Sequence, residues 1–229
     1  MTAEQFRDLW LRSRLLPASE VQAHFARWLA AALRPESGND FAGWLVSRGV
    51  LTRYQADLLL EGRADNFLLD LYRIEERIGK GAAAKVFRAS HPRHGKAAVK
   101  VLPPSRGRDA EQLARFQREG RLLIRLQHPG IVRGLELGQC RGLHYLAMEY
   151  VPGYTVDDLR RKHASIDKLM PIEHIACVAS QSCQGLHYAH ALADARGVSL
   201  GLVHRDVSPH NLIVSVDGGC AGTQRRHAS

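Results

Sequence analysis

The chain contains 229 residues with a formal net charge of +9, and 45% of its residues are hydrophobic. This length allows one or two domains that each bury a hydrophobic core. The basic residues are spread along the chain, with no basic strip interleaved with aromatic residues, so we expect no binding of nucleic acid.

Residues 1–65 are predicted to form a helical N-terminal extension. From Val21 to Leu33, apolar residues recur at steps of three and four, which is the spacing of an amphipathic helix. Ser19 followed by Gln22 is the pattern of a capping box, in which two side chains satisfy backbone N–H groups at a helix start. We therefore expect this helix to begin at Ser19.

Two more helices are expected in the same extension. One contains Phe41 and Trp44 and ends at Gly49, which is expected to take the left-handed conformation found just after many helices. The next opens with a capping box formed by Thr52 and Gln55. We expect a small bundle that packs on the following domain, and the alternative is a surface that docks a partner.

A glycine-containing turn between two strands comes next. Residues 73–78 alternate like a half-buried strand, and residues 86–89 return as a second strand. Gly79, Lys80 and Gly81 lie between them. Because glycine has no Cβ, the backbone of such a turn can approach phosphate oxygens closely.

A lysine ends the following apolar strand, at residues 97–100. A buried lysine needs a carboxylate partner. Glu119 follows in a helical segment, although a helical glutamate taken alone is more often a solvated surface charge. Apolar residues fall at helical spacing on one face of residues 115–126, so we expect Glu119 in the middle of a helix.

Two later segments are predicted from their apolar patterns. Residues 143–153 form a strand that stops at a Pro-Gly turn signal. Residues 172–190 carry the dense apolar stripe of a buried helix, and Cys177 and Cys183 belong to that stripe or its edge. We therefore expect these cysteines to pack in a core and not to bind a metal.

The cysteines also bear on the compartment. Cys140, Cys177, Cys183 and Cys220 form no Cys-x-x-Cys pair, and no secretory signal pattern is present, which favours reduced thiols in a cytoplasmic protein. No apolar run approaches the roughly 20 residues of a membrane helix, so no membrane segment is expected.

Residues 202–214 contain an apolar run, a polar loop and a second apolar run. The loop places Asp206 five residues before Asn211. A carboxylate can accept the proton of an attacking hydroxyl, and a carboxamide oxygen can bind the magnesium ion that neutralises phosphates. This spacing therefore suits phosphoryl transfer.

In this order, the segments resemble the protein kinase family, and in particular bacterial Hanks-type serine/threonine kinases. Residues 204–211 are similar to the H-R-D-x-x-x-x-N loop, residues 79–86 to G-x-G-x-x-G-x-V, and residues 97–100 to V-A-I-K. The resemblance implies an α+β, protein-kinase-like fold with a β-rich N-lobe and a partial helical C-lobe. It also implies transfer of the ATP γ-phosphate to a protein substrate, with ATP and Mg²⁺ as cofactors.

The resemblance implies a role for each matching residue. Asp206 would orient the acceptor hydroxyl, and Lys100, held by Glu119, would bind the α- and β-phosphates. Asn211 would bind the magnesium ion. The other positions around the nucleotide would be Ile78, Gly79, Lys80, Gly81, Ala82, Ala83, Ala84, Lys85 and Val86 in and beside the turn, Ala98 and Ile213 against the adenine, and Glu149 and Val151 through their backbones.

Three positions depart from the family pattern. Ala84 stands where the third glycine is expected, and Ser208 stands where serine/threonine kinases carry a lysine that neutralises the transferring phosphoryl group. His210 occupies the position at which tyrosine kinases place an arginine. We hypothesise that protonated His210 supplies part of the missing charge, so that activity falls as the pH rises through its pKa. An ordinary solvated loop histidine is the alternative.

The resemblance covers residues 72–219, with an N-lobe at about 72–151 and a partial C-lobe at 152–219. No D-F-G, activation loop or A-P-E follows, so we expect a chain truncated before D-F-G, with residues 220–229 as an aberrant or disordered tail. The competing hypotheses are a pseudokinase-like fragment that binds nucleotide weakly or docks partners through residues 1–65, and a small-molecule kinase of the aminoglycoside phosphotransferase type.

Overall fold

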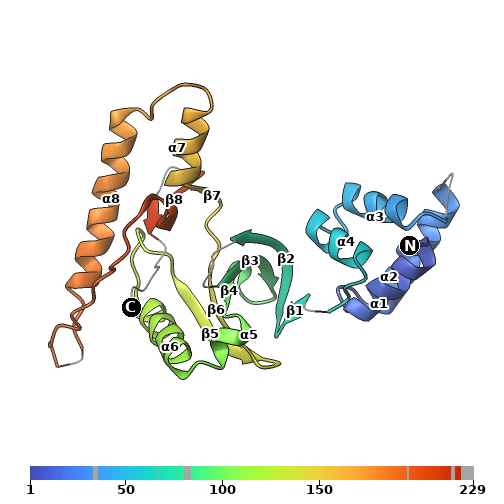
Figure 1. Ribbon diagram of the computed structural model, residues 1–229, viewed down its shortest axis with the longest axis horizontal. Helices are drawn as coiled ribbons and strands as arrows, with labels where there is room; N and C mark the ends of the chain where they lie inside the picture. The colour runs from blue at the N-terminus through green and yellow to red at the C-terminus, as the bar shows by residue number, and fades with distance from the viewer. Residues whose placement is uncertain (33–35, 66, 80–83, 195, 218–219, 223–229) are drawn as a thin grey trace. The chain divides into compact units, whose positions relative to one another are not determined.

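The computed structural model of the chain describes residues 1–32, 36–65, 67–79, 84–194, 196–217 and 220–222 (Figure 1). The chain divides into two compact units. The first consists of Met1–Asp109 and Gly138–Tyr145, and the second of Ala110–Leu137 and Leu146–Ser229. Each unit is described by itself below.

The N-terminal extension is a bundle of helices built around aromatic side chains. The helices are α1 (Ala3–Ser13), α2 (Ala18–Ala31), α3 (Gly38–Ser47) and α4 (Arg53–Leu60). Phe41 lies at the centre of the bundle, because its ring centroid is 5.4 to 6.1 Å from those of four other aromatic residues. These are Phe6, Trp10, Phe25 and Trp28, which are all buried.

The helix starts and ends of the bundle test three of the sequence predictions. The capping box of Thr52 and Gln55 is confirmed at the start of α4. The left-handed Gly49 after α3 is also confirmed, with φ of +68°. The capping box of Ser19 and Gln22 is wrong: α2 begins one residue earlier, at Ala18, and its N-cap is Pro17, which has no side-chain donor or acceptor. Helix α1 was not predicted as a separate element.

A six-stranded sheet follows, with the order β1-β2-β3-β4-β6-β5. Its strands are β1 (Leu68–Leu69), β2 (Tyr72–Gly79), β3 (Lys85–His91), β4 (Gly95–Val101), β5 (Gly134–Cys140) and β6 (Leu143–Glu149). A short helix, α5 (Pro104–Gly107), comes after β4. Strands β2, β3 and β4 pair antiparallel, as the strand-turn-strand pattern of the sequence predicted.

Strand β2 is irregular at two points. Ile74 pairs with Ala89 and Glu76 with Arg88, so Glu75 is an extra residue with no partner in the register. A second shift lies between Arg77 and Gly79. Such bulges bend a strand and increase its twist, and they therefore decide where its end lies.

The second unit contains the remaining helices and a three-stranded sheet. These elements are α6 (Ala110–Arg125), β7 (Gly153–Thr155), α7 (Val156–Ala164), α8 (Ile172–His190), the 3-10 turn η1 (Pro209–Asn211), β8 (Leu212–Ser215) and β9 (Cys220–Gly222). The sheet order is β7-β8-β9. Residues 220–222, part of the expected aberrant or disordered tail, pair with β8 as a strand. The rest of that tail lies outside the described residues.

Helix α8 has the predicted bounds, but the N-terminal part of its apolar stripe is exposed. Ile172 is 70% exposed and Ile175 46% exposed, and Cys177 and Cys183 are exposed as well. The prediction that these cysteines pack in a core is therefore wrong. An apolar stripe reports which face of a helix is hydrophobic, and it does not report whether another element covers that face.

Among the helices that the structure describes, none has the length and hydropathy that crossing a bilayer requires.

Candidate active site

The candidate site centres on the loop between α8 and β8. Asn211 is only 5% exposed, at the end of the η1 turn, and its Nδ2 donates to the Oδ2 of Asp206 and to the backbone oxygen of Asp206, both at 3.0 Å. The Asp206 N–H in turn donates to Nδ1 of His204 at 3.3 Å. These bonds hold the loop in one conformation, with the Asp206 side chain half-buried beside Asn211.

The Asp206 carboxylate and the Asn211 amide can each make a further contact of a different kind. The Asp206 carboxylate accepts one bond from Asn211 and can accept another from an incoming hydroxyl. Because the amide nitrogen of Asn211 is used in that bond, its oxygen is the atom that the side chain would offer to a divalent cation. The sequence predicted that Asp206 and Asn211 belong to one site, and the structure brings their side chains into contact.

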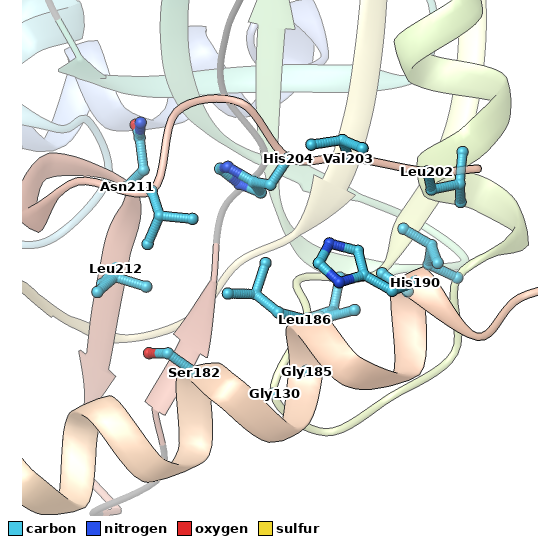
Figure 2. A pocket seen from close by; sticks show the side chains of 14 residues that line it. Gly130, Ser182, Gly185, Leu186, His190, Leu202, Val203, His204, Asn211 and Leu212 are labelled. Atoms are coloured by element: carbon cyan, nitrogen blue, oxygen red, sulfur yellow. The ribbon is translucent and has the colours of Figure 1, made fainter.

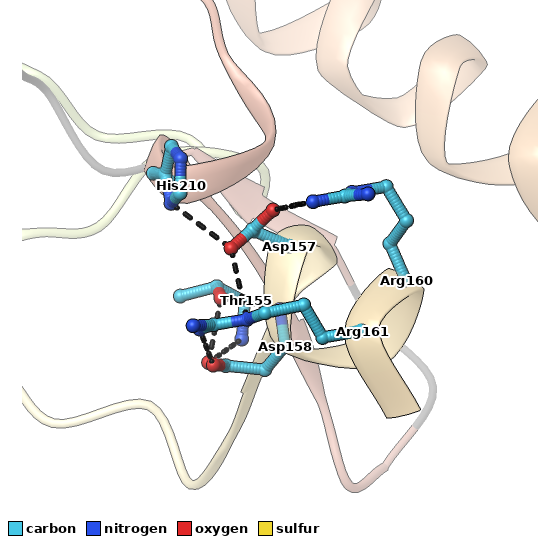
Figure 3. A network of polar contacts seen from close by, with 6 residues as sticks. All are labelled: Thr155, Asp157, Asp158, Arg160, Arg161 and His210. Carbon is cyan, nitrogen blue, oxygen red and sulfur yellow. Dashed lines mark hydrogen bonds and ion pairs between the residues drawn. The ribbon is translucent and has the colours of Figure 1, made fainter. Parts of the chain in front are cut away.

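A polar network joins His210 of η1 to Asp157 at the start of α7 (Figure 3). His210 Nδ1 lies 3.3 Å from Asp157 Oδ2, and Arg160 and Arg161 reach the same carboxylate at 2.9 and 3.1 Å. The hydrogen bond from Arg160 lowers the pKa of Asp157, and the charges of His210 and Arg161 add to this effect against the opposing effect of burial.

This network gives His210 a defined contact that sequence reasoning missed. Asp157 stands more than fifty positions before His210, and no motif linked them. The His210 side chain is 71% exposed and lies 3.3 Å from the Asp157 carboxylate, whose pKa is lowered. A protonated His210 gains an ion pair there. Its part in the reaction stays a prediction.

The residues predicted to bind phosphates lie at one end of the β2, β3 and β4 strands. Val86 on β3 is opposite Gly79 on β2 and also opposite Lys100 on β4. Lys100 is buried, with 8% exposure, and Ala98 and Ala84 are buried as well. Ile78 is 44% exposed and Lys85 is exposed. Lys80, Gly81, Ala82 and Ala83 lie outside the described residues.

Glu119 lies in the middle of α6, as predicted, on a helix whose Phe116, Gly120 and Leu123 are buried. Lys100 belongs to the first unit and Glu119 to the second. Their pairing therefore stays a prediction.

The segment predicted to contact adenine runs from the end of β6. The backbone N–H of Glu149 donates to Arg133 O at 2.9 Å, and its Oε1 accepts from the Arg133 N–H at 2.8 Å. Val151 follows, half-buried, before β7. Ile213 on β8 pairs with Thr155 on β7. Their roles toward adenine stay predictions.

Sequence reasoning also missed an apolar pocket behind the loop, shown in Figure 2. Leu186 and His190 of α8 line it together with Leu202, His204 and Leu212. The lining residues come from three separate segments, within 126–131, 182–190 and 202–212, so no local pattern indicates the pocket. The residues that line the pocket include His204 and Asn211, which both bond to Asp206, so the pocket adjoins the loop that carries Asp206.

Comparisons with known proteins agree with these features. The family model described as "Protein kinase domain" matches residues 72–220, which is more than half of the chain. A probable serine/threonine-protein kinase of Clostridium acetobutylicum is 34% identical over 153 residues, which make up 66% of this chain and 21% of that protein. The serine/threonine-protein kinase PknI of Mycobacterium tuberculosis is 32% identical over 155 residues, with coverages of 67% and 24%.

Two further comparisons extend this picture. The tyrosine-protein kinase MasK of Myxococcus xanthus is 29% identical over 151 residues, which are 64% of this chain and 23% of that protein. The crystal structure of the kinase domain of M. tuberculosis PknI has a TM-score of 0.58 and 29% identity, covering 71% of this chain and 62% of that one. The chain spans about a fifth to a quarter of the length of the curated relatives that it matches.

Proposed function

The chain belongs to the protein kinase family, and from this membership we propose that it transfers the γ-phosphate of ATP to a serine or threonine hydroxyl of a protein substrate. The expected α+β, protein-kinase-like fold is confirmed by the likeness to the PknI kinase domain. The family uses ATP and a divalent metal in general. Magnesium as that metal, and the phosphorylation activity of this chain, are proposals.

The contact between Asp206 and Asn211 is the observation that carries the proposal. Asp206 orients the acceptor hydroxyl and takes its proton as the new oxygen–phosphorus bond forms, while the bond between the γ-phosphorus and the bridging oxygen of ATP breaks and ADP leaves. Asn211 keeps Asp206 in place through its amide N–H and offers its oxygen to the magnesium ion. The bound magnesium ion supplies positive charge that neutralises the phosphates.

The strands of the first unit supply the phosphate-binding part of the proposal. Lys100, with Glu119 as its partner, binds the α- and β-phosphates, and the turn from Ile78 to Val86 covers them through its backbone. The alignment of Gly79, Val86 and Lys100 across neighbouring strands supports this role.

The adenine is proposed to lie between small and branched apolar side chains. Val86 and Ala98 cover it on one side and Ile213 on the other, and the backbones of Glu149 and Val151 bond its edge. We further propose that His210, which lies 3.3 Å from the Asp157 carboxylate, supplies positive charge near the transferring group when it is protonated.

The serine/threonine preference is supported by the names of most relatives, although one is named a tyrosine-protein kinase. A protein substrate is therefore the proposed partner, and residues 1–65 are a further docking surface in the same proposal. We propose a cytoplasmic location, which the thiols of Cys140, Cys177 and Cys183 support because none of the three is in a disulfide.

The direct test compares the wild-type chain with Asp206→Asn in the presence of ATP, magnesium and an acceptor protein. Mass spectrometry then assigns each new phosphate to serine, threonine or tyrosine. We expect phosphate on serine and threonine, and a loss of about 10²-fold to 10⁴-fold in the variant, which removes the proton acceptor and keeps the side-chain shape. Equal incorporation by both proteins would contradict the proposed role of Asp206.

A further inference from the structure

The capping box of α4 does more than start a helix, because both of its side chains also bond to strand β2. Gln55 is 4% exposed, and its Oε1 accepts from the Thr52 N–H at 3.0 Å while its Nε2 donates to Ile74 O at 2.6 Å. Thr52 Oγ1 accepts from the Gln55 N–H at 3.2 Å and donates to Glu75 O at 2.5 Å. The two consecutive carbonyl groups of β2 are thus bonded by the helical bundle.

These two carbonyl groups lie at the first bulge of β2. Glu75 is the residue with no partner on β3, so its backbone leaves the regular pairing of the sheet. A buried backbone carbonyl is costly without a hydrogen-bond partner, and the bundle supplies a donor to each of these two. The bundle therefore contacts β2 at the point where the strand bends.

The side chain of Glu75 connects the same point to the next two strands. Its carboxylate accepts from Lys96 Nζ on β4 at 2.6 and 2.7 Å and lies 3.3 Å from Arg88 Nε on β3. At the bulge, α4 and its N-cap thus bond to the backbone of β2, while β3 and β4 contact the side chain of Glu75. Two peripheral contacts support the same interface, between the rings of Tyr54 and Phe87 and between Arg73 and Leu15 O.

Four residues after the bulge, β2 ends at Gly79, which lies opposite Val86 and in line with Lys100. We propose that Thr52 and Gln55 are positioning residues, and that the helical bundle sets the bend of β2 so that Gly79, at its end, is aligned with Val86 and Lys100 for nucleotide binding. This inference rests on the proposed function, and it goes beyond it by giving residues 1–65 a part in nucleotide binding.

The chain contains its own control for this inference. Thr2 and Gln5 form an identical capping box at the start of α1, where Gln5 Oε1 accepts from the Thr2 N–H at 2.9 Å. Among the described residues, that pair makes no side-chain bond to a strand. Gln55→Glu keeps the acceptor that caps α4 and replaces the donor to Ile74 O by an oxygen, and Gln5→Glu makes the same exchange away from the sheet.

Two measurements on the full chain separate positioning from stability. The first is the affinity for an ATP analogue with magnesium, and the second is hydrogen exchange at the backbone amides of β3 and β4. For Gln55→Glu we expect about tenfold weaker binding, equivalent to about 1.4 kcal/mol, together with faster exchange near Val86 and Lys100. For Gln5→Glu we expect both readouts to stay within about twofold of wild type.

A second pair of variants covers the case in which Gln55→Glu fails to fold. Thr52→Asp keeps a capping acceptor and removes the donor to Glu75 O, and Thr2→Asp is its match on α1. Equal affinity and equal exchange in the α4 and α1 variants would overturn the inference. So would unfolding of both α4 variants, since the bundle would then be needed for the fold and not for position. If the wild-type chain bound no nucleotide, the proposed function would fall, and the exchange data alone would decide whether the bundle positions β2.

Discussion

Val86 on β3 lies directly opposite Lys100 on β4. The same valine lies opposite Gly79 on β2, so the end of the glycine turn, an apolar side chain and a buried lysine form one row across the sheet. This row is where the phosphates and the adenine meet in the proposed function.

Lys100→Met is expected to weaken binding of an ATP analogue by at least about tenfold, because the variant removes the cation proposed to bind the phosphates and keeps the length of the side chain. Isothermal titration calorimetry measures the affinity. Lys168→Met is a matched control, because Lys168 is an exposed lysine in another part of the chain. If both variants bind the analogue as tightly as wild type, Lys100 has no role in nucleotide binding.

The pH dependence of phosphoryl transfer tests His210. The pKa of Asp157 is lowered, so this carboxylate stays charged throughout the pH range in which histidines lose their proton. The wild-type rate should therefore fall as the pH rises through that range, by about fivefold, while His210→Ala should show a flat and lower profile. Identical profiles for the two proteins would show that His210 is not involved.

Glu75 is expected to stabilise the first unit at neutral pH. Burial raises the pKa of Glu75, but the hydrogen bond and charge of Lys96, a hydrogen bond from Ser90 and the charge of Arg88 outweigh this effect, and the pKa lies below its ordinary value of 4.5. Since the folded-state pKa is lowered, the stabilisation is complete above about pH 4.5 and is lost as the pH falls through the folded-state value.

Glu75→Gln should therefore reduce the free energy of unfolding by about 2 kcal/mol at pH 7, and the difference from wild type should shrink in acid. Denaturant titration at several pH values measures this. Glu76→Gln is the control, because Glu76 also contacts Arg88 but its side chain is 48% exposed, and a change below about 0.5 kcal/mol is expected. A difference between Glu75→Gln and wild type that persists unchanged in acid would argue against this electrostatic account.

The local patterns of the sequence predicted the parts of the site that depend on short spacings. Asp206 and Asn211 are five residues apart, so their contact follows from one loop. The contact of His210 with Asp157 was not predictable, because it joins two helical turns that no periodicity relates. The hydrogen bond from Gln55 to Ile74 O was not predicted for a different reason. A capping box already explains why Thr52 and Gln55 stand at the helix start, so nothing in the sequence indicated a second bond to a strand.

Burial was the least predictable property. Helix α8 has the expected bounds, yet Ile172 and Ile175 in its first turns are exposed, while Gly185 and Leu186 further along pack against other segments. The opposite case is Lys100, whose burial followed correctly from its place at the end of an apolar strand. Hydrophobic pattern thus predicted the element in both cases, and only tertiary contact decided what covered it.

The most direct test of the account is the affinity of the wild-type chain for an ATP analogue, measured by calorimetry with and without magnesium, beside Asn211→Ala and the surface control Asn39→Ala. The account predicts that magnesium raises the affinity of wild type and of Asn39→Ala by at least about tenfold, and that Asn211→Ala loses this increase. Nucleotide binding that is indifferent to magnesium, or no binding at all, would contradict the claim that this chain forms a phosphoryl-transfer site.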